Sequence, residues 1–271
     1  MNYSLDPYRP RASVIHTLDP RVKLGLTLAF IVTMALTPPG AWPVYIVLCA
    51  LALATALLSE LGVGYVLGRA LLALPFALAA LPVLFTTAGT PLLTFPAPVA
   101  LTLTTEGLAR FTGIALKSWL SVQMAVVLVG STPFPDLLLA MRALRIPRLL
   151  AAIVGLMWRY LFVLVDEALR LLRARESRSA PPRCAAAFAG RGRRVGGSLA
   201  WRARVAGGMV GNLFLRAFDR ADRIYAAMLA RCYDGEVRVL PRPSLRLGQW
   251  AVLSVGLATL ALLALAGLLW G

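Results

Sequence analysis

Residues 247–270 read LGQWAVLSVGLATLALLALAGLLW, a stretch that contains no charged side chain. A helix of about 20 residues is needed to cross the ~30 Å hydrocarbon core of a bilayer, and this stretch is long enough. An uninterrupted apolar run of this length is typical of a transmembrane helix rather than of a helix in a soluble core. This stretch therefore decides the broad class of the fold.

The composition of the whole chain agrees with that interpretation. The sequence has 271 residues, of which 59% are hydrophobic and 15% charged, and its mean hydropathy is +0.75. An ordinary soluble domain is about 45–50% apolar and about 25% charged. We therefore expect an all-α, polytopic membrane protein with about five transmembrane helices. The other four apolar stretches cover about residues 24–37, 42–58, 68–85 and 107–130.

Prolines and basic residues interrupt two of these stretches. The third contains Pro75 and Pro82, which transmembrane helices tolerate when neighbours satisfy the freed carbonyls. Residues 86–106, which contain Gly89 and three prolines among Thr and Leu, are predicted to form an outside loop that is partly re-entrant. In the fourth stretch we expect Arg110 to extend toward the membrane surface and Lys117 to face a partner or a cavity.

Positive charge is concentrated in one part of the chain. The sequence has 28 Lys+Arg against 12 Asp+Glu, a net charge of +16, and its pI is about 11.2. Residues 131–247 alone contain 21 arginines and 8 acidic residues, a net of +13. Because positive loops are retained in the cytoplasm, this basic block is predicted to be cytoplasmic. In a membrane protein such charge serves topology and contact with anionic lipid more often than binding of nucleic acid.

The basic block is predicted to be helical. Helical spacing of apolar residues with arginines between them, as in residues 148–178 and 199–231, is typical of amphipathic helices. The predicted organisation is a cytoplasmic N-terminal arm at 1–23, four transmembrane helices at 24–131, a cytoplasmic helical region at 132–246 and a C-terminal transmembrane helix at 247–271.

Residues for catalysis, metal binding and phosphate binding are missing from the sequence. There is no G-x-x-x-x-G-K-[ST] phosphate loop, and the single histidine, His16, has no sequence neighbour for a metal site. Cys49, Cys184 and Cys232 are scattered and odd in number, so they indicate neither disulfides nor a metal knuckle. We therefore expect a chain that is not an enzyme and holds no cofactor. No cleavable signal peptide is recognisable.

Two short motifs in the basic block share a dipeptide. Ala174-Arg175 and Ala230-Arg231 each lie near the end of a predicted helix. Alanine lets a partner surface approach closely, and arginine offers a planar fork for a carboxylate. Two such helix tips would suit two equivalent sites on a dimeric partner. At the other end of the chain, Asp19-Pro20 is predicted to cap the first long helix, with the proline at its first position.

Several segments in order resemble the transmembrane T component of energy-coupling factor (ECF) importers. The last is closest to the cobalt-type CbiQ subfamily, whose pattern is A-M-x-x-R-G-Y-D-G. The segments are residues 16–24 (HTLDPRVKL), 141–148 (MRALRIPR) with 157–160 (MWRY), 174–176 (ARE) and 227–235 (AMLARCYDG).

The resemblance implies a role. A T component joins two cytoplasmic P-loop ATPase subunits, which bind the ATP, to a membrane-embedded substrate-binding S component. Residues 132–246 would then be the coupling-helix region, and cobalt ion would be the substrate. The chain would lie in a bacterial or archaeal cell (inner) membrane as a multi-pass protein with a cytoplasmic N-terminus, in contact with lipid and with no nucleic acid.

The resemblance also assigns residues to these roles. The ATPase contacts would come from two X-R-X motifs, with the arginines meeting partner carboxylates. The N-terminal motif would be structural. The coupling residues are Ala174, Arg175, Glu176, Ala230, Arg231 and Cys232, and the structural residues are His16, Leu18, Asp19, Pro20, Arg21 and Lys23.

The sequence departs from the family pattern at one position, and three other functions are considered. Cys232 stands where the family usually has glycine, which is favoured past a helix end because it accepts positive φ. The alternative within transport is the same T subunit serving nickel, biotin or other vitamin S components. A different class of protein would be a membrane anchor whose basic block binds anionic lipid or nucleic acid. A stand-alone secondary transporter is disfavoured because paired broken helices and an intramembrane ion site are not recognisable.

Overall fold

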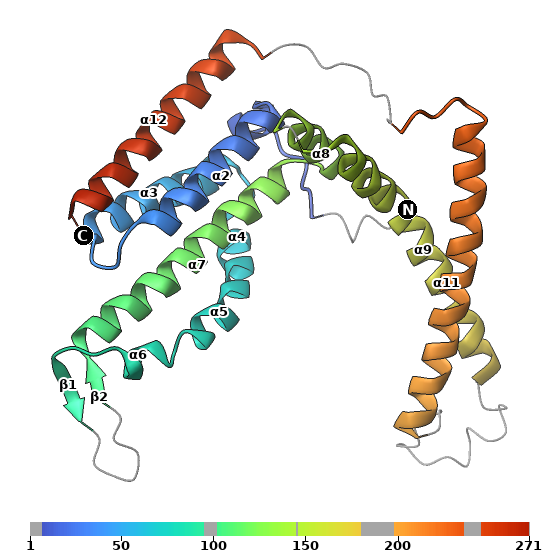
Figure 1. Cartoon of the computed structure of the whole chain (residues 1–271), viewed down its shortest axis with the longest axis horizontal. Helices are drawn as coiled ribbons and strands as arrows, with labels where there is room; N and C mark the ends of the chain where they lie inside the picture. Colours follow the sequence, from blue (N-terminus) through green and yellow to red (C-terminus); the bar gives the residue numbers. More distant parts are fainter. Residues whose placement is uncertain (1–6, 95–101, 145, 180–197, 236–244, 271) are drawn as a thin grey trace. The chain divides into compact units, whose positions relative to one another are not determined.

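The chain is divided into two separately packed units (Figure 1). The first unit consists of Met1–Arg145 and Pro241–Gly271, and the second of Ile146–Leu240. Both ends of the chain belong to the first unit, because its last helix packs against its first long one. The computed structural model describes residues 7–94, 102–144, 146–179, 198–235 and 245–270.

The first long helix, α2 (Pro20–Leu36), begins at the predicted cap. Asp19 has an extended backbone, and its Oδ1 accepts a hydrogen bond from the Arg21 backbone N–H at 2.9 Å. Pro20 occupies the first helical turn, where its missing N–H leaves no helical hydrogen bond unmade. The predicted capping roles are confirmed, and the helix starts before the predicted span, at Pro20 rather than Leu24.

The central element of the first unit is α7 (Thr105–Ser131), which contacts α2, α3 (Trp42–Leu58) and α4 (Val63–Ala70). The largest buried cluster lies among α2, α3, α7 and the last helix, α12 (Leu247–Trp270). Its members fill the space between helices because apolar side chains at helical spacing share one face. They are Phe30, Met34, Ala41, Val44, Tyr45, Leu48, Ala52, Leu120, Met124 and Leu260.

The third predicted span is not one helix. Pro75 lies in the first turn of one short segment and Pro82 directly precedes another. Proline lacks the N–H of a helical hydrogen bond and clashes with the preceding turn, so it restarts the helix rather than continuing it. All of the segments contact α7. They are α4 (Val63–Ala70), the 3₁₀ helix η2 (Leu71–Ala73), α5 (Leu74–Ala79) and α6 (Val83–Thr86).

The loop predicted for residues 86–106 is partly wrong. β1 (Pro91–Thr94) pairs antiparallel with β2 (Thr102–Thr104), so that Leu93 lies opposite Leu103. Gly89 and the three prolines of this segment indicated a loop and obscured two short runs that contain threonine, which favours strands. Residues 95–101 lie outside the described part of the chain, and the re-entrant character predicted for the loop is not tested.

α12 and α8 (Phe134–Ala143) both pack against α2. Glycines bring α2 and α12 close together: a Cβ atom on Gly256 would lie 2.5 Å from Leu26 Cδ2. On the other side of α2, Leu24, Leu128 and Ala140 form a small buried cluster with α8. The sequence placed α8 with the basic block, whereas contacts place it in the first unit.

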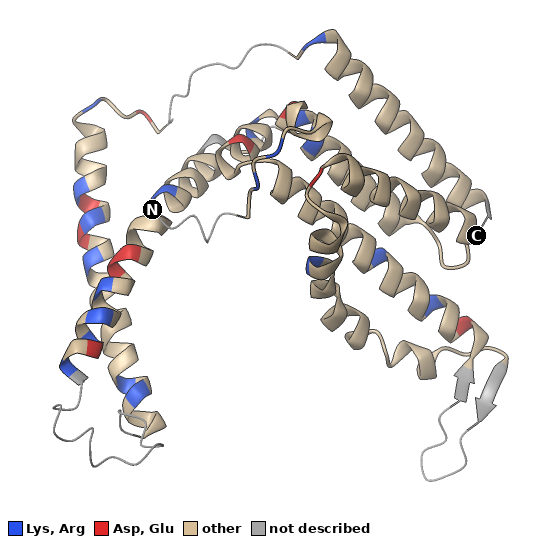
Figure 2. Cartoon of the chain, turned by 180° about the vertical axis from the view of Figure 1, so that it is seen from behind, with Lys and Arg blue, Asp and Glu red and all other residues tan. Residues whose placement is uncertain are grey.

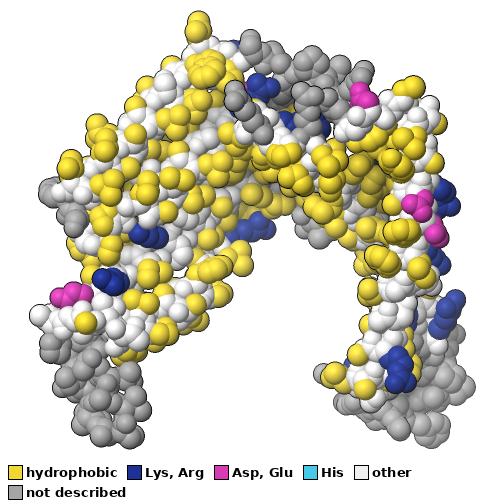
Figure 3. Space-filling model, in the orientation of Figure 1, with side chains coloured by type: hydrophobic (Ala, Val, Ile, Leu, Met, Phe, Trp, Pro, Cys, Tyr) yellow, Lys and Arg dark blue, Asp and Glu magenta, His cyan; other side chains and the backbone are white. Residues whose placement is uncertain are grey.

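Apolar side chains are spread over the face of the first unit that Figure 3 shows. Ile46, Phe76 and Leu262 are all more than 60% exposed, which is expected of a lipid-facing surface and not of a soluble one. Within the described residues, four helical segments are long and apolar enough to cross a membrane, and α2 and α3 are shorter, with 17 residues each. The chain is therefore a multi-pass helical membrane protein. The four segments are Val63–Thr86, Thr105–Ser131, Leu149–Arg178 and Leu247–Leu269.

The second unit consists of two long helices, α9 (Arg148–Ser179) and α11 (Leu199–Leu229). Charged residues are concentrated on both helices (Figure 2). Among its described residues, only Ala151 and Ala152 are buried, and α11 contributes none. Part of α9 is one of the four segments apolar enough to span a membrane, so its cytoplasmic placement stays a prediction.

Candidate functional site

Two side-chain contacts fix how α9 and α11 lie against each other. Glu167, in the middle of α9, contacts Arg216 in the second half of α11. Arg175, near the end of α9, lies with its Cζ 5.9 Å from the ring centroid of Trp201, near the start of α11. The two helices are therefore antiparallel, and the end of α9 meets the beginning of α11.

Glu167 joins the two helices through two arginines. Its Oε1 and Oε2 each lie 3.3 Å from a guanidinium nitrogen, of Arg216 and Arg220 respectively. These arginines are four residues apart and so share one face of α11. The Glu167 side chain is only 16% exposed, whereas the arginines are half-exposed, so each pair contributes at most about 1 kcal/mol.

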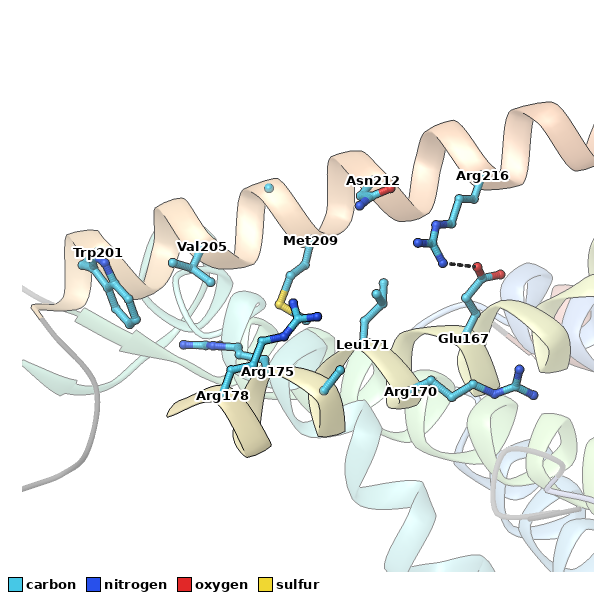
Figure 4. Close-up of a pocket in the computed structure, with 12 residues that line it drawn as sticks. Glu167, Arg170, Leu171, Arg175, Arg178, Trp201, Val205, Met209, Asn212 and Arg216 are labelled. Carbon is cyan, nitrogen blue, oxygen red and sulfur yellow. Dashed lines mark hydrogen bonds and ion pairs between the residues drawn. The ribbon is translucent and has the colours of Figure 1, made fainter. Parts of the chain in front are cut away.

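A groove of about 720 Å³ runs between α9 and α11, and Glu167 and Arg216 are among the residues that line it (Figure 4). Its lining contains four arginines and a single acidic residue, so its electrostatic potential favours an anion. Figure 4 shows the Arg175 side chain reaching toward α11 within it. The lining residues are Glu167, Arg170, Leu171, Ala174, Arg175, Arg178, Trp201, Val205, Gly208, Met209, Asn212 and Arg216.

Two residues of the first coupling motif belong to this groove. Ala174 and Arg175 line it, and Glu176 is exposed outside it. The distance of Arg175 to the Trp201 ring is within the ~6 Å range of a cation–π contact, which holds the guanidinium in place. A guanidinium held this way is suited to a bidentate hydrogen bond with a carboxylate.

The second coupling motif caps the other end of α11. The Tyr233 N–H donates to the Met228 carbonyl at 3.1 Å, and the Cys232 N–H to the Leu229 carbonyl at 3.0 Å. These two bonds define a Schellman cap, and Cys232 has the left-handed φ of +59° that the motif requires. Cys232, which carries a Cβ atom, therefore has a strained backbone at a position where the family usually has glycine. Ala230, Arg231 and Cys232 are exposed at the tip.

The structure does not bring the two arginines together. Arg175 lies beside Trp201, at the start of α11, whereas Arg231 follows its last turn. At 1.5 Å per residue, the helix separates the two positions by about 45 Å along its axis. The candidate site is thus a pair of tips at opposite ends of one helix pair.

The N-terminal motif lies in the first unit and is tied to its neighbours by hydrogen bonds. His16, in the short helix α1 (Val14–Thr17), has Nδ1 2.7 Å from Ser13 Oγ and Nε2 3.0 Å from the Arg9 carbonyl. These local contacts account for the histidine without a metal. Within the described residues, no group of three or more His, Cys, Asp or Glu side chains is placed to hold a metal ion.

Lys23 holds the arm against the bundle. Its Nζ donates to the Ser131 carbonyl at 3.2 Å and to the His16 carbonyl at 3.4 Å, and the residue is only 7% exposed. Ser131 is the last residue of α7, so the lysine satisfies a carbonyl that the helix leaves open. Leu18 and Arg21, between these residues, are half-buried.

The lysine in the fourth predicted span faces a helix end. Lys117 Nζ donates to the Ala35 carbonyl at 3.3 Å, in the last turn of α2, where carbonyls have no partner within the helix. A cation there also interacts favourably with the helix dipole. Lys117 thus has a hydrogen-bond partner within the bundle.

Sequence reasoning missed the residues that complete the groove around Arg175. Trp201, Asn212 and Glu167 belong to segments that it predicted as helices without pairing them. One signal was present: Arg216 and Arg220 have the four-residue spacing of one helix face and needed an acidic partner.

Comparison with known proteins identifies similar sequences over most of the chain. Residues 11–241 match the family CbiQ, described as "Cobalt transport protein". A protein named "Energy-coupling factor transporter transmembrane protein EcfT", from Ruminiclostridium cellulolyticum, is 26% identical over 94% of this chain and 92% of its own length. The "Cobalt transport protein CbiQ" of Rhodobacter capsulatus is 30% identical over 60% and 62%. The "Nickel permease LarQ" of Lactiplantibacillus plantarum is 32% identical over 44% and 38%.

Proposed function

Because the chain belongs to the CbiQ family of cobalt transport proteins, we propose that it transmits motion from two cytoplasmic P-loop ATPases to a membrane-embedded S component. The observation that carries this proposal is the position of Arg175, in a basic groove and against an aromatic ring. The chain itself performs no catalysis in this scheme and holds no cofactor. ATP binds to the partner subunits.

The spacing of the two tips supports this role. Arg175 and Arg231 lie at opposite ends of the α9–α11 pair, about 45 Å apart along the helix axis. Two separated contacts suit a pair of ATPases better than a single binding site does. Each arginine would form a bidentate pair with a carboxylate of one ATPase.

The contacts between the helices explain how motion at one tip would reach the other. Glu167 of α9 pairs with Arg216 and Arg220 of α11, so a displacement of one helix pulls on the other. Little else is buried between them, which lets the crossing of the two helices change at low cost. The S component would respond to that change by reorienting and releasing its substrate inward.

The orientation and the cargo follow from the same proposal. The basic block must face the ATPases, so the second unit and the N-terminal arm lie on the cytoplasmic side. Cobalt ion is the proposed substrate, and nickel, biotin or another vitamin is the alternative, because a nickel permease is also among the relatives.

The test is a double substitution at the two tips. Arg175→Ala with Arg231→Ala should abolish both co-purification of the ATPase pair and uptake of radioactive cobalt by cells that express the complete transporter. A matched control, Arg173→Ala with Arg223→Ala, removes two exposed arginines from the same helices and should leave both measurements unchanged. Unchanged ATPase association in the tip variant would contradict the proposal. Uptake of nickel or biotin in place of cobalt would correct the substrate alone.

A further inference from the structure

Two arginines from distant parts of the first unit share one aromatic ring. The Cζ atoms of Arg9 and Arg69 lie 3.8 and 4.5 Å from the centroid of the Tyr65 ring. The two guanidinium groups are therefore no more than about 8 Å apart, and like charges at this distance repel. Within the described residues, neither arginine forms an ion pair with a carboxylate. Two like charges held this close attract an anion.

The arginine pair lies near the end of the membrane-spanning segments. Arg69 is inside the candidate span Val63–Thr86, and its guanidinium turns back one helical turn to Tyr65, toward the start of that span. A basic side chain within a span directs its charge toward the membrane surface in this way. Arg9 is held at the same place because its N–H donates to the Gly130 carbonyl at 3.0 Å, near the end of α7. Both charges are thus at the level of lipid headgroups.

An apolar groove begins beside Arg69. It lies between the α4–α5 segment and α7, and its volume of about 350 Å³ is within the ~300–1,000 Å³ range of ligand sites. Its first residue, Ala70, directly follows Arg69, and the groove continues along the chain away from the two arginines. All but one of its lining residues are apolar: Ala70, Leu71, Ala73, Leu74, Ala77, Thr112, Ala115, Leu116 and Trp119.

We propose that this surface binds one anionic phospholipid, with its phosphate bound by Arg9 and Arg69 and an acyl chain in the groove. A headgroup phosphate supplies the missing negative charge, and its chain then extends into the bilayer along the apolar lining. An acyl chain is surrounded by hydrocarbon whether bound or free, so the groove contributes packing rather than a hydrophobic gain. The headgroup therefore sets the preference of the site. The N-terminal arm, which carries Arg9, becomes part of a lipid-binding site.

The test measures the preference of the full-length protein for phosphatidylglycerol over phosphatidylcholine, by native mass spectrometry of lipids retained from mixed nanodiscs. A cation near a membrane surface contributes about 1 kcal/mol, which corresponds to about a fivefold preference for each arginine. Arg9→Gln with Arg69→Gln should abolish the preference, and Arg9→Lys with Arg69→Lys should retain most of it. Ala77→Phe fills the groove and should reduce retention of the lipid at the site.

A control variant tests whether the lipid preference is specific to Arg9 and Arg69. Arg11→Gln with Arg110→Gln removes two exposed arginines outside the site and should leave the preference intact. A loss of preference as large in this control as in the Arg9 and Arg69 variant would show general electrostatics and overturn the site. An undiminished preference in Arg9→Gln with Arg69→Gln would also overturn it. Unchanged retention in Ala77→Phe would overturn the position of the acyl chain, and melting temperatures in phosphatidylcholine confirm that each variant is folded.

Discussion

The two units of this protein differ in what holds their helices in place. In the first, helices surround α7 and bury continuous clusters of apolar side chains. In the second, two helices of similar length meet through one acidic residue, three arginines and an aromatic ring. Packed cores resist deformation, whereas sparse polar contacts rearrange at low cost. The first unit is therefore a rigid membrane scaffold, whereas the crossing of the two helices in the second can change at low cost.

Removing a core side chain from the first unit gives the largest expected effect. Leu120→Ala leaves a cavity in the central cluster, where Leu120 is fully buried, and should lower the free energy of unfolding by about 2–5 kcal/mol. Phe218→Ala on α11, where the side chain is 60% exposed, should change it by less than about 0.5 kcal/mol. Unfolding in mixed micelles measures both. Equal losses would mean that the second unit has a core of its own and would remove the contrast.

A substitution at Lys23 tests whether this residue holds the N-terminal arm against the helices of the first unit. Lys23→Met leaves the carbonyls of His16 and Ser131 without their donor, which should cost about 1–3 kcal/mol. The arm should then become susceptible to limited proteolysis, which mass spectrometry of the fragments detects. Arg11→Met, at an exposed position of the arm, is the control and should remain protected. Equal cleavage of both variants would show that Lys23 does not anchor the arm.

A substitution at Glu167 tests the ion pairs that join α9 and α11 in the second unit. Glu167→Gln removes the negative charge between Arg216 and Arg220 and should reduce protection from hydrogen exchange in α9 and α11 by up to about 1 kcal/mol. Protection in α7 should stay the same. Asp222→Asn, an exposed acidic residue on α11, serves as the control. A loss that spreads to α7 would contradict the independence of the two units.

The smallest expected effect is a gain at the end of α11. Cys232→Gly relieves the left-handed backbone of a residue that carries a Cβ atom and should stabilise the last turn by about 0.5–1 kcal/mol. Hydrogen exchange of that turn measures the gain. Cys232→Ala keeps the Cβ atom and should show none. A similar gain from alanine would attribute the effect to the thiol rather than to the backbone.

Local signals in the sequence predicted much of this structure. Asp19-Pro20 marked the start of α2, the apolar run at residues 247–270 marked α12, and the expected glycine position at Cys232 has positive φ. Each of these features depends on a few neighbouring residues. Their physical causes are capping, hydrophobic length and backbone sterics, which are all readable from a short stretch.

Features that depend on pairing between distant segments were not predicted. The groove around Arg175 requires the register of α9 against α11, and residues 180–197 between them carry no signal for it. The contact of Lys117 with Ala35 requires knowing which end of α2 adjoins α7. The sequence shows the two prolines of the third predicted span, but whether a proline kinks a helix or divides it depends on the neighbouring helices.

The close approach of α2 and α12 at Gly256 also bears on how the protein is made. A ribosome synthesises α2 (Pro20–Leu36) long before α12 (Leu247–Trp270), because about two hundred residues of chain separate them. The side of α2 that α12 covers therefore stays open to lipid until α12 has been made and inserted. A product that lacks α12 would leave this side of α2 exposed.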